Sequence, residues 1–199
     1  MSEKWRLFIA IELPQTVLSE LADLQAALRA RTPDRVLRWT RPEGIHLTLK
    51  FLGDVPTGDL AAIQAALTDA AANHAPFNLV VEGVGCFPNT QRPRVVWAGV
   101  GGDTRTLAQV QAAVEQHVAP LGYPTEKRPF NPHLTLARMQ RSADRAALEA
   151  VGRTVEGWQA RSRIASWEVQ AISLMRSQLR PDGAVYTEVQ RAPLAAPDA

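Results

Sequence analysis

The chain has 199 residues, of which 46% are hydrophobic and 21% charged, and its formal net charge is +2. These values are typical of a globular protein with a sizeable core, and they exclude a disordered or fibrous chain. Its apolar runs fall short of the roughly 18 residues that a membrane helix needs. The single cysteine, Cys86, excludes an internal disulfide, and the N-terminus lacks the apolar segment of a signal peptide. We therefore expect a cytoplasmic protein without membrane contact.

Taken in chain order, the apolar residues predict strands that are connected by both helices and hairpins. Alternation with period two and short apolar runs predict strands at 5–11, 36–39, 45–52, 77–87, 93–100, 132–138, 162–176 and 184–190. Apolar residues spaced three or four apart predict helices at 14–31, 57–73, 103–119 and 143–155. This mixed order favours the α+β class over a doubly wound α/β fold. The Pro- and Ala-rich segment 192–199 is expected to be a disordered tail.

One tetrapeptide occurs twice, as His46-Leu47-Thr48-Leu49 and as His133-Leu134-Thr135-Leu136. An Arg-Pro pair precedes each histidine by the same distance, at 41–42 and at 128–129. Once a histidine is given, the following Leu-Thr-Leu should arise by chance roughly one time in a thousand at this composition. The repeat therefore calls for a physical explanation.

The alternation within each copy predicts a strand that presents histidine and threonine on one face and buries its leucines. Two such strands across a shared cleft would bring together two imidazoles and two hydroxyl donors. One imidazole can act as a base and the other as an acid, while two hydroxyls suit an anion with two free oxygens, such as a phosphodiester. The simpler alternative, a solvated polar face, would explain one copy better than two matching copies. We expect no metal site, because each copy offers a single good ligand.

The two tetrapeptides resemble the signature of the 2H phosphoesterase superfamily, and in particular its LigT-like branch. That branch contains the RNA 2',3'-cyclic phosphodiesterases, which are also called 2'-5' RNA ligases. The similarity extends over most of the chain, including residues 6–11, 53–55, 83–87, 130–132 and 174–177, Arg138 and Tyr186. The resemblance implies a bilobal fold in which two pseudo-symmetric lobes of antiparallel sheet and helices surround a central cleft. We expect residues 1–191 to form this single catalytic domain as a monomer, with one motif strand in each lobe.

The resemblance also implies a reaction, the metal- and cofactor-free hydrolysis of RNA 2',3'-cyclic phosphodiester ends to 2'-phosphomonoesters. RNA with such ends, including tRNA fragments, would be the partner. His46 would donate a proton to the departing 3' oxygen, and His133 would accept one from the attacking water. The repeat alone cannot assign these two roles. Thr48 and Thr135 would stabilise the charge on the non-bridging oxygens.

Two further residues are candidates for substrate binding. The resemblance places Arg138 in the phosphate site, yet its odd offset from His133 would turn it to the other face of a regular strand. Phosphate binding by Arg138 therefore requires a bend near the end of the strand. Phe8 matches a core residue by its strand pattern, whereas the resemblance favours stacking on an RNA base.

Three other functions remain open at this point. The same residues, run in reverse, would join a 2',3'-cyclic end to a 5'-hydroxyl through a 2'-5' bond. A non-catalytic RNA-end binding module is disfavoured, because a pure binder would more naturally use arginine or lysine than two histidines. A phosphodiesterase for small cyclic nucleotides is also compatible with the sequence. His74 and His117 lie near the ends of expected helices, where the helix dipole gives a structural reason for a histidine.

Overall fold

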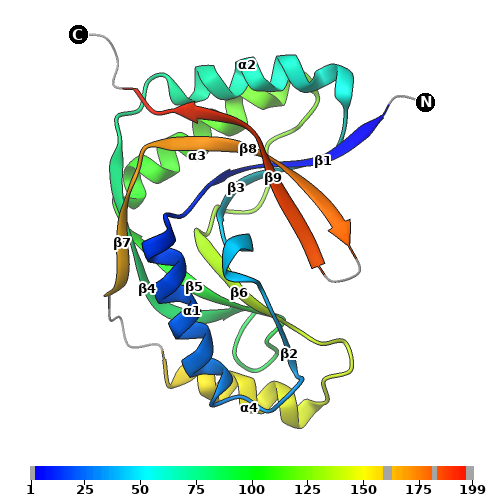
Figure 1. Cartoon of the computed structure of the whole chain (residues 1–199), viewed down its shortest axis with the longest axis vertical. Coiled ribbons are helices and arrows are strands. Elements are labelled where there is room, and N and C mark those ends of the chain that lie inside the picture. Colours follow the sequence, from blue (N-terminus) through cyan, green and yellow to red (C-terminus); the bar gives the residue numbers. More distant parts are fainter. Residues whose placement is uncertain (1–2, 159–162, 181–182, 196–199) are drawn as a thin grey trace.

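The computed structural model describes residues 3–158, 163–180 and 183–195, and Figure 1 shows how their helices and strands are arranged. Within these ranges the chain forms one nine-stranded sheet and four α-helices. The strands are β1 (Lys4–Ile11), β2 (Leu37–Trp39), β3 (Leu47–Pro56), β4 (Phe77–Phe87), β5 (Val95–Gly102), β6 (His133–Met139), β7 (Arg163–Val169), β8 (Ala171–Arg180) and β9 (Gly183–Pro193). The helices are α1 (Gln15–Arg29), α2 (Leu60–Ala71), α3 (Thr104–Val118) and α4 (Arg145–Glu156). The predicted α+β class is confirmed.

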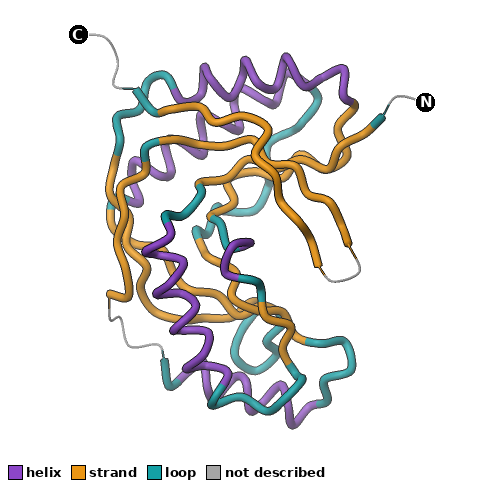
Figure 2. Tube along the Cα trace, viewed as in Figure 1, coloured by secondary structure: helices purple, strands orange, loops and turns teal. Residues whose placement is uncertain are grey.

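The sheet is antiparallel, and its order places the two motif strands side by side in the middle. Along the sheet the strands run β7-β4-β5-β6-β3-β1-β8-β9, and β2 pairs separately with β6. Helices α2 and α3 pack together at one end of the molecule, while α1 and α4 lie at the other end (Figure 1). The tube in Figure 2 shows the strands running continuously between these two sets of helices.

Two of the helices cross from one half of the sheet to the other. Helix α1 follows β1 but packs against β7, and α3 follows β5 but packs against β3. The leucines and valines of both helices enter one continuous core cluster together with strands from both halves. Because each crossing helix covers strands of the other half, its packing helps to hold β3 and β6 next to each other.

The structure corrects the predicted strand at 162–176, which is in fact two strands. The chain turns at Gln170, after which β8 pairs with β1, whereas the preceding β7 pairs with β4 near the opposite edge of the sheet. The apolar alternation continues across this corner, and no glycine or proline marks it. Periodicity alone therefore could not locate the break.

Two predicted ends are also wrong. The first motif strand was expected to stop at Gly53, but β3 continues to Pro56 and pairs with the start of β1. The tail was expected from residue 192, but β9 extends to Pro193, and Leu194 is buried with its N–H bonded to the carbonyl of Gln170. Burial of Leu194 in the core explains why the ordered chain continues beyond the expected end. Residues 196–199 lie outside the described part of the structure.

None of the helices in the described ranges is both long enough and apolar enough to cross a membrane.

Candidate active site

The two motif strands meet at their equivalent leucines. Leu47 of β3 pairs directly with Leu134 of β6 in antiparallel register, and both side chains are fully buried. Neighbouring residues on a strand point to opposite faces, so the histidine and threonine on either side of each leucine project to the other face of the sheet. Continuing the register by one residue sets His46 opposite Thr135 and Thr48 opposite His133. We call the face of the sheet that carries these four side chains the motif face.

Both histidine rings are held by the same backbone contact. Nδ1 of His46 lies 2.9 Å from the carbonyl oxygen of Gly44, and Nδ1 of His133 lies 2.8 Å from that of Asn131. A carbonyl oxygen only accepts hydrogen bonds, so Nδ1 must carry the proton and donate it in each ring. Each imidazole therefore keeps Nε2 available to exchange a proton with a ligand.

Aromatic rings surround His46. Its imidazole stacks on Phe8, with ring centroids 4.6 Å apart and planes at 29°, and it meets the ring of Tyr186 edge-on at 5.0 Å. Burial by these rings lowers the pKa of His46 from 6.5 to about 4, although the bond to Gly44 acts in the opposite direction. The charge of His133 lowers the pKa of His46 further, which indicates that the two imidazoles are electrostatically coupled.

The surroundings of His133 differ from those of His46. Phe87 contacts the His133 ring edge-on, with centroids 4.9 Å apart and planes at 89°. In the described part of the chain no aromatic ring stacks on His133 as Phe8 does on His46. The two histidines therefore have the same backbone contact, but aromatic rings enclose His46 more than His133. This difference in environment separates two side chains that the sequence repeat makes equivalent.

The two threonines present unused hydroxyl groups on the motif face. Both are only half-buried, and neither hydroxyl bonds to another protein group within the described residues. On the side away from the facing histidine, Thr48 pairs with Ala10 of β1 and Thr135 pairs with Trp97 of β5, and neither of these side chains can accept a hydrogen bond. These hydroxyls are available to donate to an anion between the histidines.

Arg138 reaches the motif face because β6 contains a bulge. The ladder to β5 shifts register between Thr135 and Ala137, so Leu136 is an extra residue without a partner on that side. Leu136 and Ala137 are consecutive and both fully buried, and the next residue, Arg138, is exposed. The inserted residue reverses the alternation, so Arg138 faces the same way as Thr135. The bend that phosphate binding by Arg138 requires is therefore present in β6.

The expected role of Phe8 needs correction. Its side chain is 2% exposed and lies beneath His46 and Tyr186, so a base has no access to it in this arrangement. The exposed ring on this face is that of Phe51, which is 66% exposed and 5.9 Å from Phe8 between centroids. Phe51 is not among the residues predicted from the sequence, although its position carries a signal: it stands five residues after His46, as Arg138 stands five after His133.

Other candidate sites in the described part of the chain lie elsewhere or are absent. Nδ1 of His117 bonds to the carbonyl of Ala113 in its own helix, as expected for a structural histidine. No cluster of three or more His, Cys, Asp or Glu in the described residues could hold a metal ion. Cavities of about 490 Å³ beside α4 and about 520 Å³ near the start of α1 contain no motif residue, so neither is the cleft expected between the histidines.

Comparison with known proteins identifies the family. Residues 13–181 match the model of the 2'-5' RNA ligase superfamily. The RNA 2',3'-cyclic phosphodiesterase of Methanothermobacter thermautotrophicus is 33% identical over 94% of this chain and 97% of its own length. That of Thermus thermophilus is 34% identical over 94% of this chain and 88% of its own.

Solved structures agree with these sequence matches. TT0787 of Thermus thermophilus superposes with a TM-score of 0.79 and 31% identity, covering 97% of this chain and all of the other. Escherichia coli LigT in complex with 3'-AMP gives a TM-score of 0.75 and 26% identity, covering 96% of this chain and 99% of LigT. The chain therefore has the 2H phosphoesterase fold and belongs to the 2'-5' RNA ligase superfamily.

Proposed function

We propose that the protein hydrolyses the 2',3'-cyclic phosphodiester at the end of an RNA to a 2'-phosphomonoester. The relatives named RNA 2',3'-cyclic phosphodiesterase support this substrate, and the LigT complex with 3'-AMP supports a site for a nucleotide phosphate. The observation that carries the proposal is the symmetric pair of imidazoles. Each ring donates Nδ1–H to the backbone and stands opposite a threonine hydroxyl, and among the described residues neither its Nε2 nor that hydroxyl has a hydrogen-bond partner.

The reaction needs one proton accepted and one donated. The oxygen of a water attacks phosphorus, the bond from phosphorus to the 3' oxygen breaks, and the five-membered ring opens. Nε2 of His133 takes the proton from the water, and Nε2 of His46 donates a proton to the departing 3' oxygen. The products are a 2'-phosphomonoester and a free 3'-hydroxyl, so protons balance without a cofactor.

Three side chains would stabilise the negative charge that grows on the non-bridging oxygens. The hydroxyls of Thr48 and Thr135 donate from the two motif strands, and Arg138 adds a guanidinium from the bulged end of β6. The exposed ring of Phe51, in place of Phe8, offers the terminal base a surface on which to stack.

His46 must gain a proton before it can act as the acid. Its pKa of about 4 leaves the free protein with a neutral imidazole at pH 7. A phosphate anion about 4 Å away favours the charged imidazole by roughly 4 kcal/mol at an effective dielectric constant near 20. That corresponds to about three pKa units. We therefore assign the acid to His46 with its proton taken up on substrate binding, and the base to the less enclosed His133.

The test is incubation with nucleoside 2',3'-cyclic phosphates and with short RNA that ends in a 2',3'-cyclic phosphate. A 2'-phosphomonoester should form, and His46→Ala and His133→Ala should each lower turnover by about 10²–10⁴-fold. His117→Ala, at an exposed histidine bonded to its own helix, is the matched control and should leave turnover unchanged. A double-alanine variant with near-normal turnover after chelator treatment would refute the proposal.

The two roles can be separated with a phosphodiester whose leaving group is nitrophenolate. Such a leaving group departs without a proton, so His46→Ala should retain most of its activity on this ester. His133→Ala should remain defective, because the water still needs a base. If His133→Ala kept its activity on this ester and His46→Ala did not, His133 would be the acid and His46 the base.

Ligation is the second candidate, and the superfamily that matches residues 13–181 is named for it. A 5'-hydroxyl in the place of water would attack the same phosphorus and use the same histidines. Mixing cyclic-ended RNA with 5'-hydroxyl RNA and analysing the linkage measures this reaction directly. A 2'-5' bond that depends on both histidines would support it.

A further inference from the structure

Strand β2 brings a second arginine next to Arg138. The short β2 pairs with the end of β6, and the Cα of Arg38 is the direct partner of the Cα of Arg138. Directly paired residues of an antiparallel ladder point to the same face, with Cβ atoms about 4.5–5.5 Å apart. Arg38 therefore shares the motif face with Arg138, while the residue before it, Leu37, is buried on the opposite side.

Arg38 and Arg138 carry positive charge that the described residues do not balance with a carboxylate. Like charges in directly opposed positions of a ladder destabilise it. In the described part of the chain no carboxylate forms an ion pair with Arg38 or Arg138, and both side chains are exposed. The chain as a whole has a net charge of only +2, so this concentration of guanidinium groups is local.

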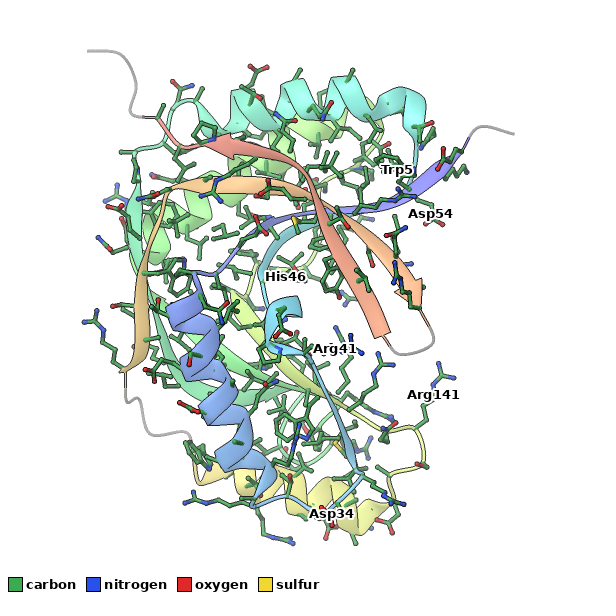
Figure 3. All side chains as sticks on the ribbon, viewed as in Figure 1. Trp5, Asp34, Arg41, His46, Asp54 and Arg141 are labelled. Carbon is green, nitrogen blue, oxygen red and sulfur yellow. The ribbon has the colours of Figure 1, made fainter. Side chains whose placement is uncertain are left out.

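The basic surface continues beyond the pair. Arg41 follows the end of β2 by two residues, and Arg141 follows the end of β6 by two, and both are exposed. Figure 3 labels these two arginines, which lie where the chain leaves each strand. A planar guanidinium with several donors binds phosphate oxygens better than a lysine of the same charge would.

We propose that Arg38 binds a second phosphate of the substrate, on the 5' side of the terminal ribose. The proposal rests on the hydrolysis proposed above, in which the cyclic phosphate lies between the histidines and Arg138 contacts it. The neighbouring strand then offers Arg38 one strand spacing away, about 4.8 Å, on the same face. The substrate class is therefore an RNA end or a nucleotide that also carries a 5'-phosphate, in preference to a nucleoside cyclic phosphate that lacks one.

The experiment compares a nucleoside 2',3'-cyclic phosphate with the same compound bearing a 5'-phosphate, and with a dinucleotide that has a cyclic end. Wild-type protein should show a lower KM for the two substrates with the additional phosphate. Arg38→Gln should raise KM for those two by about tenfold and leave the substrate without a 5'-phosphate unchanged. Arg38→Lys should fall between, and Arg105→Gln, an exposed arginine on α3, is the matched control.

Salt dependence gives a readout that a merely structural role would not change. The kcat/KM for the 5'-phosphorylated substrate should fall more steeply with salt than that for the plain one, and Arg38→Gln should abolish the difference. Equal effects of Arg38→Gln on all substrates, or none on any, would overturn the inference. Absence of turnover with every cyclic phosphate would instead refute the proposed hydrolysis. Binding of the corresponding 2'-phosphate products, with and without a 5'-phosphate, would then still test Arg38.

Discussion

The side chain of Gln25 donates a hydrogen bond to the carbonyl oxygen of Leu136, the extra residue in the bulge of β6. The distance is 2.9 Å, and the same amide nitrogen lies 2.8 Å from the carbonyl oxygen of Thr40. Gln25 comes from α1, the crossing helix, and is 5% exposed. A buried amide in a helix thus stabilises the bulge that turns Arg138 onto the motif face.

Replacing Gln25 with leucine should affect both stability and activity. The carbonyl of Thr40 would lose a buried donor and that of Leu136 one of its donors, at a cost of about 1–3 kcal/mol in the free energy of unfolding. Arg138 should also become less well oriented toward the substrate phosphate, so turnover should fall as well. Urea unfolding and steady-state kinetics measure the two effects. Gln109→Leu, at an exposed glutamine of α3, is the control, and equal behaviour of both variants would contradict this role.

The other motif strand is supported in a related way by the other crossing helix. The ladder from β3 to β1 shifts register around Leu49, and the next residue, Lys50, is buried. Its Nζ lies 2.5 Å from a carboxylate oxygen of Glu115 in α3 and 2.8 Å from the carbonyl oxygen of Pro124. The same carboxylate accepts the N–H of Glu126, so this network connects β3 to the segment that leads to His133.

Removing one member of the Lys50–Glu115 pair should be costly. Lys50→Met would leave the Glu115 carboxylate buried without its cation, and the expected loss is about 3–5 kcal/mol. Adding Glu115→Leu should recover a large part of that loss, because no uncompensated charge remains. A double-mutant cycle by denaturant unfolding measures the coupling. If the two single losses simply add in the double variant, the pair is not coupled as proposed.

The sequence predicted the motif strands well because their information is local. Alternation with period two is enough to place His46 and Thr48 on one side and Leu47 on the other, and the exact repeat shows that the same holds at His133. The common offset of the two Arg-Pro pairs also agrees with a shared backbone geometry before each histidine.

The features that the sequence did not reveal depend on partners from distant parts of the chain. One bulge in β6 changes the face of Arg138, and another in β3 changes the face of Phe51. No glycine marks either bulge, because the hydrogen bonds that support them come from Gln25 and Glu115 on the crossing helices. Phe8 belongs to a strand that is buried on both faces, so its pattern could not show that His46 covers it.

The lowered pKa of His46 makes stability depend on pH in a defined direction. The folded protein holds this group at a pKa of about 4, compared with 6.5 for an ordinary histidine. Between these two pH values the unfolded chain binds more protons at this group than the folded protein does. The contribution of His46 to the free energy of unfolding is therefore fully present above pH 6.5 and is lost as the pH drops toward 4. The loss from this group should be about 2–3 kcal/mol, allowing for partial solvent contact.

Comparison with His46→Gln isolates that contribution from the carboxylates that titrate in the same range. The difference in unfolding free energy between wild type and variant should change by about 2–3 kcal/mol from pH 7 to pH 4. Gln109→Leu, at the exposed and uncharged glutamine of α3, is the control and should keep the pH dependence of the wild type. Parallel curves for wild type and His46→Gln would show that burial does not depress this pKa.

Anion binding should reverse the shift, because the proposed acid gains its proton from the complex. In the free protein, NMR titration of the imidazole of His46 should give a pKa near 4. With saturating inorganic phosphate or a nucleoside 2'-phosphate the pKa should rise by about two to three units, since an anion close to the ring favours its charged form. Calorimetry at pH 5–6 should then detect proton uptake on binding, and anion affinity should weaken as the pH rises through the pKa of the complex. Thr135→Val, which removes one hydroxyl donor but no charge, should weaken binding while leaving the direction of the shift unchanged. If the pKa of His46 remained near 4 in the complex, this histidine would stay neutral and would have to serve as the base, with His133 as the acid.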